Sequence, residues 1–173
     1  MKYQKAGIRT MNLHKLFSMQ AALDAHIEEQ HGIKKEDVME KKVLALLVET
    51  GELANETRTF KFWSVKGPSD RETILEEYVD GIHFLLSLGI SLNLEDTVLD
   101  LEPKQSESSL TSQFLEVYAK IQDFRKQLSN EAYREMFQSF ISLGVMLGFS
   151  GQDIEEAYLS KNEVNYDRQK QGY

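Results

Sequence analysis

The sequence predicts an all-α protein, a bundle of amphipathic helices. Only two prolines and ten glycines occur among its 173 residues, so long continuous helices are possible. Apolar residues recur at helical spacing through several long segments, which is the pattern of helices that bury one face. The length suits one domain of ~100–200 residues, and we expect a single domain over residues 1–173.

Composition excludes several classes of function. The net charge of −8 argues against nucleic acid as a partner, and no basic patch with interleaved aromatic residues is present. The chain has no cysteine, which removes disulfides and cysteine zinc sites and suits a reducing cytosol; we expect a cytoplasmic protein. No stretch approaches the ~18 consecutive apolar residues of a membrane span, and residues 1–10 are too polar for a secretory signal.

The first helix is expected from Asn12, a good N-cap residue, to about His31. One amide, Gln20, lies in its otherwise apolar stripe. It is either a partly exposed group at the edge of the stripe or a group that hydrogen-bonds a polar ligand. An amide offers both a donor and an acceptor, which suits the edge of a nucleobase. The stripe consists of Leu13, Leu16, Phe17, Gln20, Leu23 and Ile27.

The second helix is expected from about Lys35 to Phe62. Its segment Val43–Val48 is apolar on all sides and is expected to be buried. The far end combines cations with aromatic rings, which could hold a base and its phosphates or form an exposed rim for a dimer contact. These residues are Arg58, Phe60, Lys61, Phe62, Trp63 and Lys66.

A third helix is expected to begin at Ser69, where Ser69 and Glu72 match a capping box. Its core side carries Tyr78 and Ile82. His83 follows Asp80 by three residues and lies on the same side as that carboxylate. We interpret a lone histidine here as a hydrogen-bonding support rather than as a metal ligand.

Two acidic pairs give this hairpin its chemistry. Glu49 and Glu52 are three residues apart on the second helix, and Glu77 and Asp80 repeat that spacing on the third. The pairs are symmetric about residues 63–68, which read as a turn, so an antiparallel hairpin places Glu52 opposite Glu77 and Glu49 opposite Asp80. Four carboxylates near apolar sequence favour a bound divalent cation, Mg²⁺ or Mn²⁺. The alternative is two solvated helix faces that happen to be acidic.

Two further amphipathic helices, 110–128 and 130–147, are expected to supply core or a subunit interface, and we expect a homodimer. The last helix starts at Ser150 and runs to about residue 169. Lys161, Asn165 and Arg168 share one face of it and suit phosphate oxygens, or else form a solvated helix end. For the phosphate role, we expect these cations to lack internal partners and the tail to be ordered by its ligand.

These motifs together resemble the all-helical dimeric dUTPases, a group related to the MazG-type nucleotide pyrophosphohydrolases. The resemblance implies an all-α NTP pyrophosphatase fold and a homodimer. It touches the first three helices and the C-terminus, while residues 94–147 carry no motif. The matching segments are 16–24, Glu49-Thr50-Gly51-Glu52, Phe60-Lys61-Phe62-Trp63, 76–84 and the tail from Lys161 to Tyr173.

The resemblance implies Mg-dependent hydrolysis of dUTP to dUMP and pyrophosphate. Glu49, Glu52, Glu77 and Asp80 would hold Mg²⁺ ions around the triphosphate, and one of the first two glutamates, with Glu49 favoured, would orient or deprotonate the attacking water. Gln20 and Trp63 would contact the uracil, His83 and Phe84 would lie near the deoxyribose, and Lys161, Asn165, Arg168 and Tyr173 would bind phosphates. To the substrate-binding set we add Asp24 and Lys61.

One departure leaves the substrate open. The family usually shows asparagine where this chain has Asp24, and an ionised carboxylate accepts hydrogen bonds but donates none. A related pyrophosphohydrolase acting on dCTP or another non-standard dNTP is therefore a second hypothesis. A third hypothesis is a non-catalytic helical protein that binds another protein and whose acidic site is vestigial.

Overall fold

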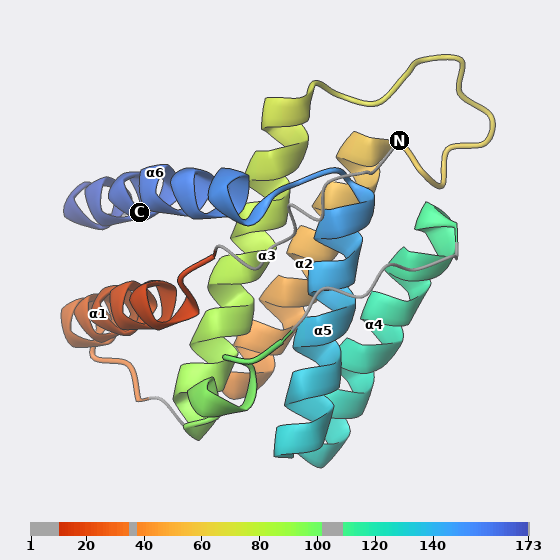
Figure 1. The fold of residues 1–173 in the computed structure, drawn as a ribbon. Coiled ribbons are helices and arrows are strands. Elements are labelled where there is room, and N and C mark those ends of the chain that lie inside the picture. Colours follow the sequence, from red (N-terminus) through yellow and green to blue (C-terminus); the bar gives the residue numbers. More distant parts are fainter. Residues whose placement is uncertain (1–10, 35–37, 102–108, 173) are drawn as a thin grey trace.

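The computed structural model describes residues 11–34, 38–101 and 109–172. In these ranges the chain forms six α-helices and one short 3₁₀ helix and no strand, which confirms the predicted all-α class (Figure 1). The elements are α1 (Leu13–His31), α2 (Met39–Thr57), α3 (Arg71–Leu92), η3 (Glu95–Thr97), α4 (Leu110–Gln127), α5 (Asn130–Met146) and α6 (Gly151–Lys170).

Helices α2, α3, α4 and α5 run roughly alongside one another, and α1 and α6 lie across α3 on one side of them (Figure 1). α2 and α3 form the predicted antiparallel hairpin. Because α1 and α6 both pack on α3 and also contact each other, residues from the two ends of the chain meet beside the hairpin. None of the helices in the described part of the chain is long and apolar enough to cross a membrane.

The observed helix ends match some of the predicted caps and bounds and differ from others. Asn12 caps α1 as predicted: its side chain accepts from the Lys15 backbone N–H. The predicted capping box at Ser69 is wrong, because Asp70 is the N-cap of α3 and the Ser69 hydroxyl donates to the Glu56 carboxylate instead. α2 is shorter than predicted at its C-terminus, since Arg58 adopts a left-handed conformation and ends the helix.

The core packs densely around α3, which carries half of the acidic hairpin. Tyr78 is fully buried and stacks on Phe140 of α5 with ring centroids 4.8 Å apart. Gly144 makes room for this ring, because a Cβ there would clash with the Tyr78 hydroxyl oxygen. Such packing fixes the position of α3 and therefore of its carboxylates, Glu77 and Asp80.

The expectation that all of Val43–Val48 is buried is wrong. Val43 and Leu46 are in the core, but Leu44 is 61% and Val48 48% exposed. These two side chains lie on the face of α2 that the other described helices leave uncovered, so a continuous apolar run did not mark a fully buried helix.

Candidate metal and nucleotide site

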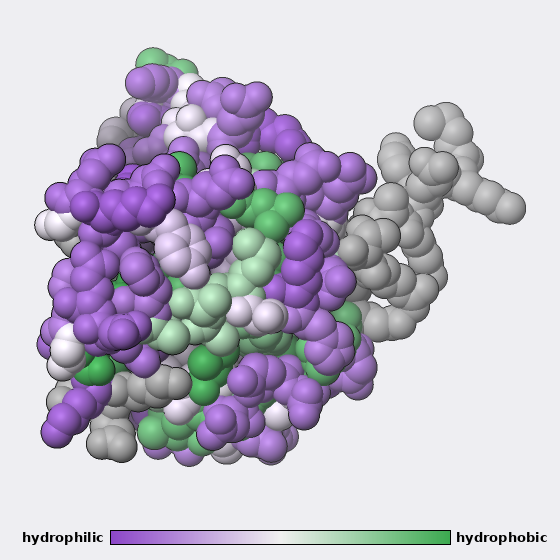
Figure 2. All heavy atoms as spheres, turned by 90° about the vertical axis from the view of Figure 1, so that its left-hand side faces the viewer, coloured by the Kyte–Doolittle hydropathy of each residue, from purple (hydrophilic) through white to green (hydrophobic). Residues whose placement is uncertain are grey.

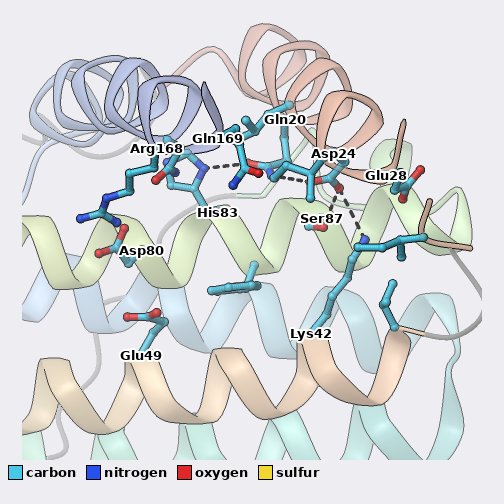
Figure 3. Close-up of a pocket in the computed structure, with 16 residues that line it drawn as sticks. Gln20, Asp24, Glu28, Lys42, Glu49, Asp80, His83, Ser87, Arg168 and Gln169 are labelled. Carbon is cyan, nitrogen blue, oxygen red and sulfur yellow. Dashed lines mark hydrogen bonds and ion pairs between the residues drawn. The ribbon is translucent and has the colours of Figure 1, made fainter. Parts of the chain in front are cut away.

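The antiparallel packing of α2 and α3 brings the acidic pairs together. Carboxylate oxygens of Glu49, Glu52 and Glu77 all lie within 4.8 Å of one another. Asp80 belongs to the same neighbourhood, since among the surrounding charges it has the largest effect on Glu49. Figure 3 shows Glu49 and Asp80 facing each other from α2 and α3.

The carboxylates are held where their charges are unfavourable. Burial, then the charges of Asp80, Glu52 and Glu77, raise the pKa of Glu49 to about 7. Burial, followed by Asp80 and Glu52, raises the pKa of Glu77. Burial also raises the pKa of Asp80, although the Lys161 ammonium opposes this shift. The cluster is therefore short of positive charge, and its oxygen-only donors fit a hard divalent ion.

Lys161 of α6 already contributes one cation to the cluster. Its Nζ lies 2.7 Å from Asp80 Oδ2 and 2.8 Å from Glu76 Oε1. The expectation that the tail cations lack internal partners is therefore wrong for Lys161. Asn165 and Arg168 lie on the same helix further along and line a pocket beside the carboxylates, whereas Tyr173 falls outside the described residues.

This pocket has a volume of about 440 Å³ and lies between α1, α2, α3 and α6, open to solvent on one side (Figure 3). Glu49, Asp80 and Arg168 line one end, and Asp24, Glu28 and Lys42 lie toward the other (Figure 3). Apolar side chains cover much of the remaining wall: Leu23, Ile27, Ile33, Val38 and Phe84. On the side of the molecule shown in Figure 2, the surface is mainly hydrophilic, with apolar side chains gathered near its centre.

Gln20 is the centre of a hydrogen-bond network in the middle of the pocket. It is 4% exposed, so the interpretation as an amide at the exposed edge is wrong. Its Nε2 donates to Asp24 Oδ1 at 2.7 Å, and its Oε1 accepts from the Tyr158 hydroxyl at 2.8 Å and lies 2.7 Å from His83 Nδ1. Ser87 donates to Asp24 Oδ2 at 2.6 Å. Among the predicted substrate residues, Gln20, Asp24, His83 and Phe84 do line one cavity.

Three members of this network were not predicted from the sequence: Ser87, Tyr158 and Lys42, whose Nζ lies 3.6 Å from Asp24 Oδ2. A spacing signal existed for each. Ser87 follows His83 by four residues and Asp80 by seven, so it shares their face of α3. Lys42 precedes Glu49 by seven residues on α2, and Tyr158 precedes Lys161 by three on α6.

The aromatic end of the hairpin lies apart from this cavity. Trp63 is 64% exposed and packs edge-on against Phe62 and Phe60, and Lys61 donates to Asn55 while its Nζ lies 5.5 Å from the Phe60 ring centre. The structure does not bring Lys61 or Trp63 to the pocket that holds Gln20. Their contact with substrate stays a prediction.

Comparison with known proteins agrees with the geometry. Residues 12–173, nearly the whole chain, match the model of the family described as dUTPase. No curated protein matches the chain. The matched region includes all six α-helices and every residue of the carboxylate cluster and the pocket. The chain therefore belongs to the dUTPase family, whose activity is the hydrolysis of dUTP.

Proposed function

We propose that the protein hydrolyses dUTP to dUMP and pyrophosphate and depends on Mg²⁺, for which Mn²⁺ can substitute. The observation that supports this most strongly is the position of the carboxylate cluster at one end of a pocket that offers amide, carboxylate and imidazole groups further along. A nucleoside triphosphate has the same polarity, with a polyanion at one end and a base that forms hydrogen bonds at the other.

Glu49, Glu52, Glu77 and Asp80 are the proposed ligands of the ion. When bound, Mg²⁺ would neutralise the triphosphate and polarise the phosphorus that is attacked. Glu49, Glu77 and Asp80 fit this role because burial and nearby carboxylates raise the pKa of each, and Glu52 has a carboxylate oxygen within 4.8 Å of those of Glu49 and Glu77. An acidic protein also needs such an ion to hold a polyanion at this position.

Glu49 is the proposed base. Its carboxylate lies beside the other proposed ligands, where it would orient the attacking water and accept its proton. Phosphoryl transfer depends mainly on positioning and on stabilisation of charge, so the protein needs no covalent nucleophile. Lys161 and Arg168, with Asn165, would contact the phosphates from α6.

The deeper part of the pocket would hold the nucleoside. Gln20 and Asp24 would meet the base, and His83 and Phe84 would lie at the deoxyribose. An apolar wall at Phe84 disfavours a 2′-hydroxyl, because burying that group without a partner costs free energy. Tyr173 is proposed as a further phosphate contact, and Lys61 and Trp63 as contacts from the hairpin end.

We further propose that the chain acts as one domain and as a cytoplasmic homodimer. The exposed apolar residues of α2, α4 and the hairpin end supply surface for a symmetric interface: Leu44, Val48, Phe62, Trp63, Val65 and Leu115.

Asp24 supports dCTP as a second candidate substrate. Its carboxylate is buried in the pocket wall and accepts hydrogen bonds, and the amino group of cytosine is a donor. The test is kcat/KM with Mg²⁺ over a panel of dUTP, dCTP, dTTP, dATP and dGTP. Preference for dUTP supports the first proposal and preference for dCTP the second. Absence of turnover with every nucleotide would contradict both, and a Glu49→Gln preparation controls for contaminating hydrolases.

A further inference from the structure

We propose that Asp24 and Lys42 are positioning residues that fix the proton of His83 on Nδ1, so that Nε2 faces the pocket as a hydrogen-bond acceptor. The nucleotide as ligand of this acceptor rests on the proposed function. The positions of the protons are independent of that function, because they follow from interatomic distances and from which atoms can donate a hydrogen bond. Figure 3 shows the chain of contacts from Lys42 through Asp24 and Gln20 to His83.

The chain of contacts begins at Lys42. Its Nζ lies 3.6 Å from Asp24 Oδ2 and donates to Ser91 Oγ at 2.9 Å. The Ser91 hydroxyl donates to the Ser87 carbonyl, which leaves its oxygen free to accept from Lys42. The Ser87 hydroxyl donates to the same Asp24 oxygen that Lys42 approaches. Asp24 Oδ2 thus faces two donors, and this side of the side chain must be an acceptor.

Asp24 in turn fixes the orientation of Gln20. Its other oxygen lies 2.7 Å from Gln20 Nε2. An ionised carboxylate only accepts, so the amide must turn its NH₂ group toward Asp24. The reversed amide would bring two oxygens together at that distance with no hydrogen between them. The carbonyl of Gln20 therefore points toward Tyr158 and His83, and Tyr158 donates to it at 2.8 Å.

Gln20 then fixes His83. Its Oε1 accepts only, so the Nδ1 atom at 2.7 Å must carry a hydrogen. Burial, with the nearby Lys161 charge, lowers the pKa of His83 to about 3, so the ring is neutral at physiological pH and Nε2 has no hydrogen. The ring is 5% exposed and stacks on Tyr158 with centroids 4.1 Å apart, which restrains it from turning over.

With the proton on Nδ1, the Nε2 atom of His83 is a buried hydrogen-bond acceptor that no group in the described part of the chain contacts as a donor. It has no hydrogen-bond partner among the described residues, and His83 lines the pocket. A buried polar atom of this kind needs a partner, and only a donor such as a hydroxyl or amino group can serve. The pocket would therefore select a ligand with a donor at this position and disfavour a carbonyl or a carboxylate there.

The test is the protonation state of His83 in the ion-free, full-length protein. The chain has only four histidines, so long-range ¹H–¹⁵N spectra of histidine-labelled protein can be assigned by the signals lost in His83→Gln. We expect wild-type His83 to be neutral with its proton on Nδ1 at pH 7. A proton on Nε2, or a charged ring, would overturn the proposal without any variant.

Asp24→Asn is the decisive variant. Lys42 and Ser87 would still demand an acceptor, so the new side-chain amide would turn its oxygen to them and its NH₂ group to Gln20. Gln20 would reverse, and the proton of His83 would move from Nδ1 to Nε2. Adding Lys42→Met should restore part of the Nδ1 form, because the Ser87 hydroxyl can then donate or accept. Lys41→Met, an exposed neighbour, is the control and should leave His83 unchanged.

Kinetics supply a second readout. Asp24→Asn should raise KM for the preferred dNTP about tenfold, the loss of roughly one hydrogen bond, and change kcat less, because the network lies away from the carboxylate cluster. An unchanged tautomer in Asp24→Asn, or a fall in kcat with constant KM, would overturn the positioning role. The spectra need no substrate, so a failure of the proposed function would be recognised separately, by the absence of turnover in wild type.

Discussion

Replacing Glu49 by glutamine is expected to stabilise the ion-free protein above neutral pH, although it removes a residue of the proposed site. In the fold, burial and the neighbouring carboxylates raise the pKa of Glu49 from 4.5 to about 7. The folded state therefore binds this proton more tightly than the unfolded state does. Stability from this group is greatest below pH 4.5, falls as the pH rises to 7, and stays reduced above pH 7.

The magnitude follows from the size of the shift. One pKa unit corresponds to ~1.4 kcal/mol of unfolding free energy, so the whole pKa shift of Glu49 would correspond to about 3 kcal/mol. The side chain is partly exposed and water screens its neighbours' charges, so we expect about 1–2 kcal/mol at pH 8. Glutamine keeps the shape of the side chain and removes the charge, which makes it the appropriate substitution.

Urea denaturation in EDTA at pH 5 and pH 8 measures this effect. Glu49→Gln should exceed wild type in unfolding free energy at pH 8, and the gap should shrink at pH 5. Adding Mg²⁺ at pH 8 should stabilise wild type and have less effect on the variant. Glu56→Gln is the control: the Ser69 hydrogen bond lowers the pKa of Glu56, so its replacement should not stabilise the protein. If the Glu49→Gln variant is no more stable than wild type at pH 8, the inferred repulsion between Glu49 and its neighbouring carboxylates is wrong.

Three other outcomes follow from the same geometry. Glu77→Gln should abolish turnover and leave the helical content unchanged, with a slight gain in ion-free stability; activity at the wild-type level with Mg²⁺ would exclude Glu77 as a ligand. Arg168→Met should lower kcat/KM tenfold or more with little change in Tm, whereas Lys170→Met, whose ammonium pairs with Asp167 at the helix surface, should be neutral; equal effects would exclude a specific phosphate contact. Light scattering should give the mass of a dimer at micromolar protein, and a monomer would contradict the proposed interface.

The fold and the acidic hairpin were predictable because their signals are local and periodic. Glu49, Glu52, Glu77 and Asp80 repeat one helical spacing on two segments joined by a turn, so the antiparallel pairing followed from symmetry alone. The capping residue of α3 was not predictable in the same way. Ser69 and Asp70 are both good N-cap residues. Asp70 is the N-cap because the Ser69 hydroxyl donates to the carboxylate of Glu56, which lies thirteen residues earlier.

The pocket was only partly predictable, since it depends on how α1 and α6 lie across α3. Lys161 was expected to have no partner within the protein before a phosphate binds, but tertiary packing brings it into ion pairs with Asp80 and Glu76. For Gln20 the sequence left open an exposed edge or a ligand contact; the structure buries the side chain and adds hydrogen bonds within the protein to its carbonyl oxygen and one amide hydrogen. Helical spacing places Tyr158 on the face of α6 that carries Lys161, but it does not show that this face meets Gln20, more than a hundred positions earlier.

The carboxylate hairpin and the pocket are proposed to act together in cleaving dUTP between the α- and β-phosphates. The most direct measurement is ³¹P NMR of a dUTP reaction with Mg²⁺, with EDTA and Glu49→Gln samples run in parallel. We predict dUMP and pyrophosphate in equal amounts with Mg²⁺, and no product in either control. Release of inorganic phosphate and dUDP, or equal turnover in EDTA, would contradict this mechanism.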